Sequence, residues 1–220
     1  LLKVGTYGLI RFNLALFPDA SKYFATAVSI LAVIGIVYGA VCALIQTDIK
    51  RLVAYSSVSH LGFVVLGISS MTVEGMQGAV YQMLAHGVST GGLFLIVGML
   101  SDRRHTRLIA EFGGLKSVMP KLVAAFLIIT LSSIGLPGLN GFVSEFLCLI
   151  GTFQASPANV LTGPGATPGM LGPWYAAIAG TGMIVAAMYL LLMLGNIVWG
   201  QLHEPHSHDE HDSESPLPRD

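Results

Sequence analysis

Apolar residues follow one another in stretches that are too long for the helices or strands of an ordinary water-soluble domain. The stretches cover residues 24–46, 52–73, 75–101, 122–154 and 173–200, and a shorter one opens the chain at 1–17. A helix needs roughly 20 mostly apolar residues to cross about 30 Å of hydrocarbon. The pattern predicts an all-α integral membrane bundle of about six transmembrane helices. Because the first stretch is short, we expect a piece of a longer polypeptide.

The composition agrees with this pattern, because 53% of the residues are hydrophobic and only 10% are charged, against about 25% in a soluble domain. Half of the acidic residues lie between positions 204 and 220, so the rest of the chain is net positive. We therefore expect a transmembrane domain over 1–200 and a polar loop or tail, rich in His, Asp and Glu, over 201–220.

The basic residues of the predicted loops indicate the orientation in the membrane. If successive helices alternate in direction, one side holds Lys22, with or without Arg11, and the other holds seven bases. The seven are Lys50, Arg51, Arg103, Arg104, Arg107, Lys116 and Lys121. Cytoplasmic loops are enriched in Lys and Arg. We expect a multi-pass protein of the bacterial inner (plasma) membrane, with these loops and the tail in the cytoplasm.

Residues 133–141, Ser-Ile-Gly-Leu-Pro-Gly-Leu-Asn-Gly, are unusual for the interior of a membrane helix. Pro137 removes a helix hydrogen bond, and the three glycines add backbone freedom. A broken backbone at membrane depth persists only where it is buried in protein or lines a wet cavity, and broken helices mark ion sites in transporters. The segment predicts one discontinuous helix, with a plain kink at a helix end as the alternative.

Four ionisable side chains fall inside the predicted spans, where a charge costs about 2.5–3.5 kcal/mol on insertion scales. Glu145, beside the break, favours a carboxyl that takes up and releases protons; the alternative is a structural partner for a neighbouring base. Lys3 fits either a proton relay or a lysine that extends toward the membrane surface from a helix end.

His60 and His86 each lie well inside a span, on stretches that also carry serine, threonine and glutamine. Imidazole titrates near neutral pH and both accepts and donates protons, which suits a relay. Hydrogen bonding between helices is the alternative role for a membrane histidine. We predict that Lys3, His60, His86 and Glu145 converge on one polar path at mid-membrane.

The tail contains a second group of titratable residues, His203, His206, His208 and His211, with Asp209 and Glu210 among them. Such a composition can hold zinc or nickel weakly, but the spacing offers no closed ligand set, and we interpret it mainly as a solvated linker. The sequence has no phosphate-binding glycine loop, no flavin or nicotinamide fingerprint and no cysteine ligand set. We therefore expect no redox centre in this chain.

Five segments together resemble the antiporter-like proton-pumping subunits of respiratory complex I, over nearly the whole chain to about residue 200. The segments are LKVGTYGLIRF at 2–12, TDIKRLVAYSSVSHLGF at 47–63, QMLAH at 82–86, GGL at 113–115 and GLPGLNGFVSEF at 135–146. Within the family the M-type chains (chain 4) are the most similar. They carry glutamate at the position of Glu145, where the other types and the related cation/proton antiporters usually carry lysine.

The resemblance implies helices eight to thirteen of a fourteen-helix protein, including its second inverted five-helix repeat. It matches Lys3 to the connecting lysine of helix eight, His60 and His86 to the central-axis histidines, and Glu145 to the terminal proton-exchanging residue. It also implies as partners the lipid bilayer and other membrane subunits of complex I, especially neighbouring antiporter-like chains, and no nucleic acid. NADH, FMN, iron–sulfur clusters and quinone would be bound by other subunits, and no cofactor by this chain.

The function that the resemblance implies is that of a proton-translocating subunit of NADH:quinone oxidoreductase, an enzyme only as part of that translocase. Quinone reduction elsewhere would drive protons along Lys3, His60, His86 and Glu145, because protonation of one group disfavours protonation of its neighbour. The alternatives are a subunit of a multisubunit cation/proton antiporter, a membrane subunit of an energy-conserving hydrogenase, and a purely structural helix bundle.

Overall fold

The computed structural model describes residues 2–155 and 171–200, and in these the chain is helical apart from short turns. The helices are α1 (Leu2–Gly8), the π-helical η1 (Leu9–Asn13), α2 (Leu14–Leu16), α3 (Pro18–Leu44), α4 (Ile49–Ser69), α5 (Val73–Arg104), the 3-10 helix η2 (Ile109–Glu111), α6 (Leu115–Val118), α7 (Pro120–Ile134), α8 (Asn140–Gln154) and α9 (Pro173–Trp199). The all-α prediction is confirmed.

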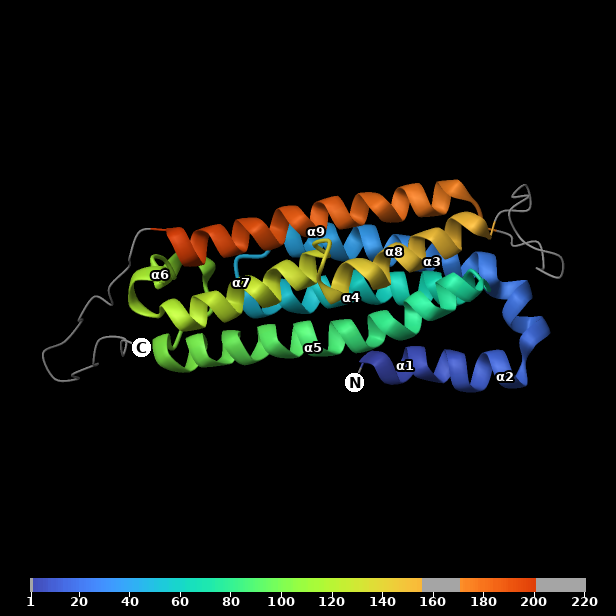
Figure 1. Cartoon of the computed structure of the whole chain (residues 1–220), viewed down its shortest axis with the longest axis horizontal. Helices are drawn as coiled ribbons and strands as arrows, with labels where there is room; N and C mark the ends of the chain where they lie inside the picture. Colours follow the sequence, from blue (N-terminus) through green and yellow to red (C-terminus); the bar gives the residue numbers. More distant parts are fainter. Residues whose placement is uncertain (1, 156–170, 201–220) are drawn as a thin grey trace, which may run out of the picture.

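The long helices lie side by side along the longest axis of the molecule (Figure 1). Within the described ranges, α3, α4, α5 and α9 are each long and apolar enough to cross a membrane. α5, with 32 residues, is about 48 Å long at 1.5 Å per residue. The remaining predicted spans differ in form: α1, η1 and α2 form one short segment, and α7 and α8 follow one another as two half-length helices.

The helix ends are set by short-range signals in the sequence. Pro18, Pro120 and Pro173 each occupy the first helical turn, where a missing N–H costs nothing. The Asp48 carboxylate accepts hydrogen bonds from the amides of Lys50 and Arg51 at 2.8 and 3.1 Å and so caps α4. These signals start α3, α4, α7 and α9 where the apolar stretches begin.

The ends of α3, α5 and α9 and the starts of α4 and α7 all lie at one end of the bundle (Figure 1). Two loops are tied together there, because the amide of Ile49 donates to the Arg107 carbonyl at 3.0 Å and the amide of Ile109 donates to the Thr47 carbonyl at 2.9 Å. The seven loop bases of the sequence analysis belong to this end, which we call the basic end. The segments that carry these bases therefore meet at one end of the bundle, and the side of the membrane on which they lie stays a prediction.

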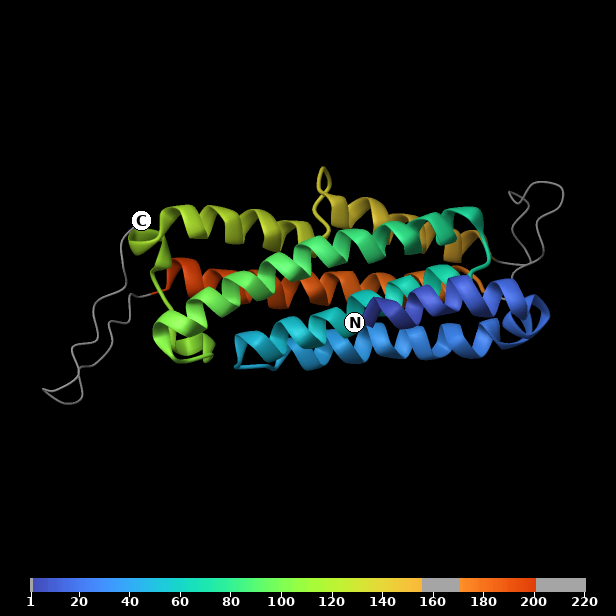
Figure 2. The ribbon, with the colours of Figure 1, turned by 90° about the horizontal axis from the view of Figure 1, so that it is seen from below.

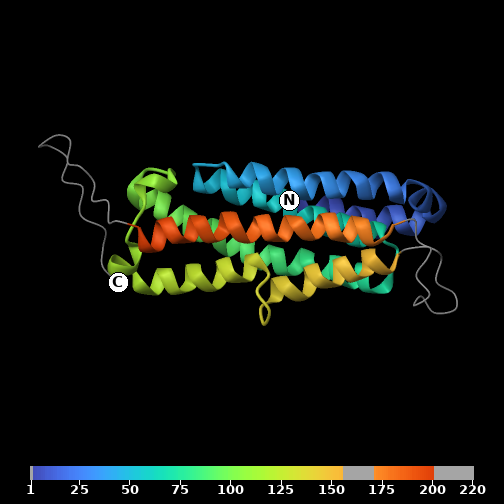
Figure 3. The ribbon, with the colours of Figure 1, turned by 90° about the horizontal axis from the view of Figure 1, so that it is seen from above.

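The break between α7 and α8 is the discontinuous helix that the sequence predicted. α7 ends at Ile134 and is followed by Gly135, whose φ of 81° is left-handed, and Gly138 has a φ of 99°. Both angles favour glycine, because a Cβ would clash with the backbone there. Figures 2 and 3 show residues 135–139 as a loop that stands out from the line of the two half-helices. The alternative of a plain kink is excluded.

The buried side chains form two apolar clusters separated by a polar layer. One cluster, toward the basic end, includes Val53, Leu93 and Ala186, and the other includes Leu61, Ala79 and Ala179. Between them, α4, α5, α7 and α8 contribute buried polar side chains. These are Ser56, Ser57, Ser59, His60, Gln82, His86, Ser89, Thr90, Thr130, Ser132, Ser133, Ser144 and Glu145. We call this group the polar layer.

A close approach of α5 and α8 brings the two sides of the polar layer together. Gly78 on α5 faces the backbone of α8, and a Cβ at this glycine would lie 2.7 Å from the amide nitrogen of Cys148. The helices can approach this closely because glycine has no side chain. Gln82 follows one turn after Gly78, and Glu145 lies one turn before Cys148, so this contact sets their separation.

Candidate functional site

The centre of the polar layer is a buried contact between Glu145 on α8 and His60 on α4. The Nδ1 atom of His60 lies 2.6 Å from Oε1 of Glu145, although the residues are 85 positions apart in the sequence. The two side chains are 2% and 3% exposed. When the carboxyl is ionised, it accepts a hydrogen bond from the Nδ1–H of His60, and the contact is a buried ion pair when the imidazole is also protonated.

Two further polar side chains hold Glu145 in place. The Nε2 atom of Gln82 on α5 donates to the same carboxylate oxygen at 3.0 Å. The hydroxyl of Ser144 donates to Oε1 of Gln82 and so orients its amide. Glu145 is also next to the break, since a Cβ at Gly135 would lie 3.2 Å from its Oε2 atom. Three helices and the broken segment therefore determine where this carboxyl lies.

His86 on α5 continues the group on the other side of His60. The two imidazole ring centroids are 5.5 Å apart, and the Nε2 atom of His86 is 3.1 Å from the hydroxyl of Thr90. His86 is 4% exposed. His60 thus contacts Glu145 directly and has the His86 ring beside it, whereas the order along the chain places His86 between His60 and Glu145.

Lys3 lies on α1 at the edge of the bundle and is only partly buried. The hydroxyl of Thr6, one turn later on α1, lies 3.0 Å from the sulfur of Met83 on α5, and Met83 precedes His86 by three residues. Through this contact, the segment that carries Lys3 lies against α5, the helix that carries His86.

A small polar cavity lies among these residues. Its lining includes His60, His86 and Glu145 together with Gln82, Ser89, Ser132, Ser133 and Gly141. The volume, about 10 Å³, is at the lower limit for one water molecule. Two of the lining residues carry a buried atom that has no hydrogen-bond partner within the described residues, Nε2 of His60 and Nδ1 of His86. Such groups are normally hydrated.

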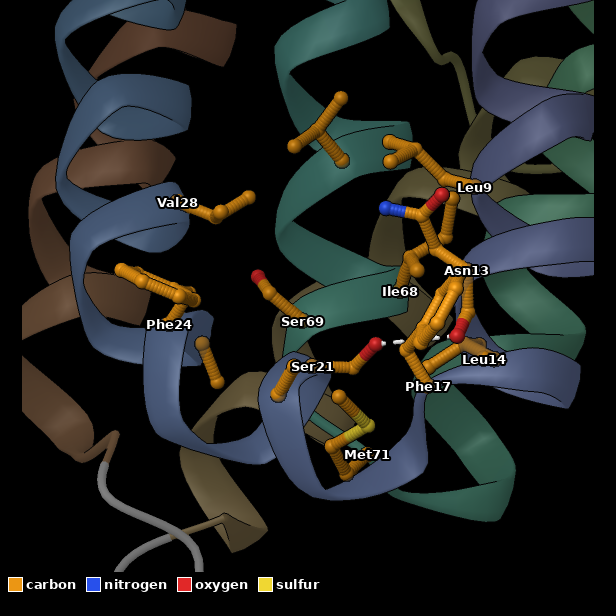
Figure 4. A pocket seen from close by; sticks show the side chains of 13 residues that line it. Leu9, Asn13, Leu14, Phe17, Ser21, Phe24, Val28, Ile68, Ser69 and Met71 are labelled. Carbon is orange, nitrogen blue, oxygen red and sulfur yellow. Dashed lines mark hydrogen bonds between the residues drawn. The ribbon is translucent and has the colours of Figure 1, made fainter.

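A second pocket, of about 210 Å³, lies between α3, α4 and the short η1–α2 segment. Figure 4 shows its apolar lining, with Phe24 and Val28 facing Ile68 and Leu9, and a 3.2 Å hydrogen bond from the Ser21 hydroxyl to the Asn13 carbonyl. None of its lining residues is ionisable. This pocket therefore adds no proton-carrying group to the polar layer.

The structure brings His60, His86 and Glu145 together around one cavity, whereas Lys3 lies at the edge of the bundle. Glu145 has His60 as a neighbouring base, which is the alternative that the sequence left open for this carboxyl. The sequence does not indicate that Gln82 and Ser144 hold the carboxyl in place. The tail histidines His203, His206, His208 and His211 lie outside the described residues. Among the described residues, no group of three or more His, Cys, Asp or Glu side chains has a metal-binding arrangement.

Chemically, this arrangement can hold and move a proton between buried groups. His60 and Glu145 share a hydrogen bond along which a proton can transfer, and His86 presents a second imidazole next to it. Each group changes its charge on transfer, so neighbouring groups influence one another through a low-dielectric interior. A bundle of membrane-length helices with a mid-length break and this group of residues defines a polytopic membrane protein with a buried line of ionisable side chains.

The chain belongs to the family described as NADH:quinone oxidoreductase/Mrp antiporter, TM, whose sequence profile matches residues 1–172. Two similar relatives are each named NADH-quinone oxidoreductase subunit M. The protein from Pseudomonas aeruginosa is 47% identical over 207 residues, which are 93% of this chain and 38% of the relative. The protein from Rhodobacter capsulatus is 43% identical over 202 residues, 92% of this chain and 36% of the relative. The chain spans somewhat more than a third of their length.

Two solved structures share the fold. A chain of "Respiratory complex I from Thermus thermophilus with bound NADH" matches 91% of this chain and 39% of its own length, with a TM-score of 0.81 and 36% identity. A chain of the Mrp complex from Dietzia sp. DQ12-45-1b matches 99% of this chain and 39% of its own length, with a TM-score of 0.81 and 20% identity. The second likeness concerns the fold alone.

Proposed function

We propose that this chain is part of a proton-translocating membrane subunit of NADH:quinone oxidoreductase and that protons pass along Lys3, His86, His60 and Glu145. The observation that carries the proposal is the buried 2.6 Å contact between His60 and Glu145 at the helix break. The names of the subunit M relatives and the likeness to a chain of respiratory complex I support the choice of complex.

The polar layer supplies a physical reason why protonation of one of these groups affects the next. When Lys3 loses or gains a proton, the electrostatic potential at His86 changes, and the change passes to His60 and then to Glu145 through short distances. Like charges repel strongly in a buried site, so protonation of one group favours release from the next. Glu145 is the last of the four and exchanges its proton with the surroundings.

The wider setting of the chain is part of the same proposal. The partners would be other membrane subunits of the complex, especially neighbouring antiporter-like chains, in a bacterial inner membrane with the basic end toward the cytoplasm. NADH, FMN, iron–sulfur clusters and quinone would be bound by those other subunits. The described helices would correspond to helices eight to thirteen of the full protein.

The test is the variant Glu145→Gln in the full-length chain, assembled in its complex and reconstituted into vesicles. The amide keeps the size and much of the hydrogen bonding of the carboxyl but carries no exchangeable charge. We expect most NADH-driven proton pumping to be lost and coupled electron transfer to slow. Glu111→Gln, an exposed residue of η2 at the basic end, is the matched control and should pump normally.

Normal pumping by an assembled Glu145→Gln complex would overturn the role of Glu145. The same vesicles separate the antiporter alternative, which the family description includes. An antiporter predicts that a sodium gradient drives proton movement without NADH, and that Glu145→Gln abolishes this exchange. Proton movement that requires NADH and does not change with a sodium gradient supports the assignment to NADH:quinone oxidoreductase.

A further inference from the structure

A pocket at the basic end reaches toward the polar layer. It has a volume of about 310 Å³ and lies between the α3–α4 turn, η2 and the last turns of α9. Gln46, Thr47 and Asn196 provide polar groups near its mouth, and Tyr189 lies in its lining two helical turns further in along α9. A pocket with polar groups of this kind can hold water.

Tyr189 stands between this pocket and the polar layer. Its side chain is 1% exposed, and its hydroxyl is a buried polar atom without a hydrogen-bond partner in the protein. The hydroxyl lies near Ser56 on α4, although their geometry is not that of a hydrogen bond. Tyrosine hydroxyls that are buried usually find a partner, which here would be water.

Ser56 completes the connection to the ionisable group. It precedes His60 by four residues on α4, so both side chains lie on one face of the helix. The unpartnered Nε2 atom of His60 is on the same side chain that contacts Glu145. From the basic end inward, the polar groups follow one another as Asn196, Tyr189, Ser56 and His60.

We propose that Tyr189 is a proton-relay residue that connects the pocket at the basic end to the His60–Glu145 pair through Ser56 and intervening water. The inference rests on the proposed function and adds an access route to it. In each transfer the phenol oxygen accepts a proton from water in the pocket and its own proton passes toward Ser56. One proton enters for each that leaves, and Tyr189 remains neutral.

The first test is Tyr189→Phe in the full-length chain assembled in its complex. Phenylalanine keeps the ring in the apolar cluster and removes only the hydroxyl. We expect proton transfer to be at least about tenfold slower and its solvent deuterium isotope effect to change. A tenfold effect is modest beside the roughly 10²–10⁴-fold contribution that is typical of positioned proton donors. Tyr175→Phe, on the same helix and only partly buried, is the matched control and should leave rate and isotope effect unchanged.

The second test blocks the pocket itself. In a complex without other reactive cysteines, with Cys42 and Cys148 replaced by alanine, Asn196→Cys is labelled with a bulky, membrane-impermeant thiol reagent. Labelling should slow proton transfer as strongly as Tyr189→Phe does. Trp199→Cys, three residues further along α9 and outside the pocket lining, should be labelled without effect.

The outcomes separate this inference from the proposed function. If Glu145→Gln abolishes pumping while Tyr189→Phe and the labelled Asn196→Cys both pump at the normal rate, the access route is wrong and the proposed function stands. If Glu145→Gln pumps normally, the proposed function is wrong whatever Tyr189→Phe does. Slow transfer in both pocket variants together with loss in Glu145→Gln supports the route.

Discussion

Glu145 on α8 and His60 on α4 are 85 residues apart in the sequence but make a 2.6 Å contact, and both side chains are almost completely buried. A buried pair of this kind is tolerated when both partners are present. Removal of one partner lowers the stability of the fold, because the other partner is left desolvated and unpaired. This asymmetry makes the pair open to a test of stability as well as of proton movement.

The first prediction concerns this pair. His60→Ala should lower the stability of the chain by about 3 kcal/mol or more, because Glu145 loses its partner and a cavity forms. In the double variant His60→Ala, Glu145→Gln the losses should not add, with a coupling of roughly 1 kcal/mol or more. Thermal unfolding of the detergent-solubilised complex measures both. His105→Asn, at an exposed left-handed position that asparagine tolerates, is the control; additive losses would show that the two residues act independently.

The second prediction concerns the approach of α5 to α8. Gly78→Ala places a Cβ 2.7 Å from the amide nitrogen of Cys148, and overpacking of this kind costs roughly 1–3 kcal/mol. The same displacement should weaken proton transfer, because it separates Gln82 from Glu145. Gly87→Ala lies on the same helix with no atom within 4 Å of its Cβ, and should be neutral or slightly stabilising in unfolding and transport assays. Equal behaviour of the two variants would contradict the packing argument.

The third prediction separates backbone strain from proximity to the carboxyl. Gly135→Ala and Gly138→Ala both place an alanine at a left-handed φ, at a cost of about 1–2 kcal/mol each. Only the Cβ at Gly135 comes near Glu145, whereas that at Gly138 has no neighbour within 4 Å. Both variants should unfold at lower temperature, but only Gly135→Ala should change the pH profile of proton transfer. A change of the same size in Gly138→Ala would assign the effect to strain.

The fourth prediction concerns the basic end. Asp48→Ala removes the side-chain cap that the amides of Lys50 and Arg51 use and should cost about 1 kcal/mol of stability. Asp48→Asn keeps an oxygen acceptor and should restore most of the loss. If asparagine is as damaging as alanine in thermal unfolding, the charge of Asp48 rather than its hydrogen bonds holds this end together.

Much of the fold could be predicted from local properties of the sequence. The long apolar stretches give α3, α4, α5 and α9, because length and hydropathy alone determine whether a helix can cross a membrane. The break at Gly135 and Gly138 is also predictable, because glycine and proline change the backbone conformation at their own positions. Each of these features depends only on residues that are neighbours in the chain.

The candidate site residues can be selected from the sequence, but their contacts cannot. Lys3, His60, His86 and Glu145 were selected because ionisable groups are costly at membrane depth. The contacts among them depend on the rotation of each helix about its axis and on close approaches such as that at Gly78. Neither can be predicted from the sequence. Gln82 is uncharged, so its presence in a span does not single it out. Tyr189 lies in an apolar stretch where an aromatic ring is expected to pack, and only the structure shows that its hydroxyl is buried without a partner.

The helix break has an electrical consequence that does not depend on any side chain. α7 ends and α8 begins in the middle of the bundle, so a carbonyl-bearing terminus and an amide-bearing terminus face the interior instead of the membrane surfaces. Each helix end carries a partial charge of roughly half an elementary unit. The main chain thus builds a permanent field next to Glu145, and a variant in which all four ionisable side chains were neutral would still contain it.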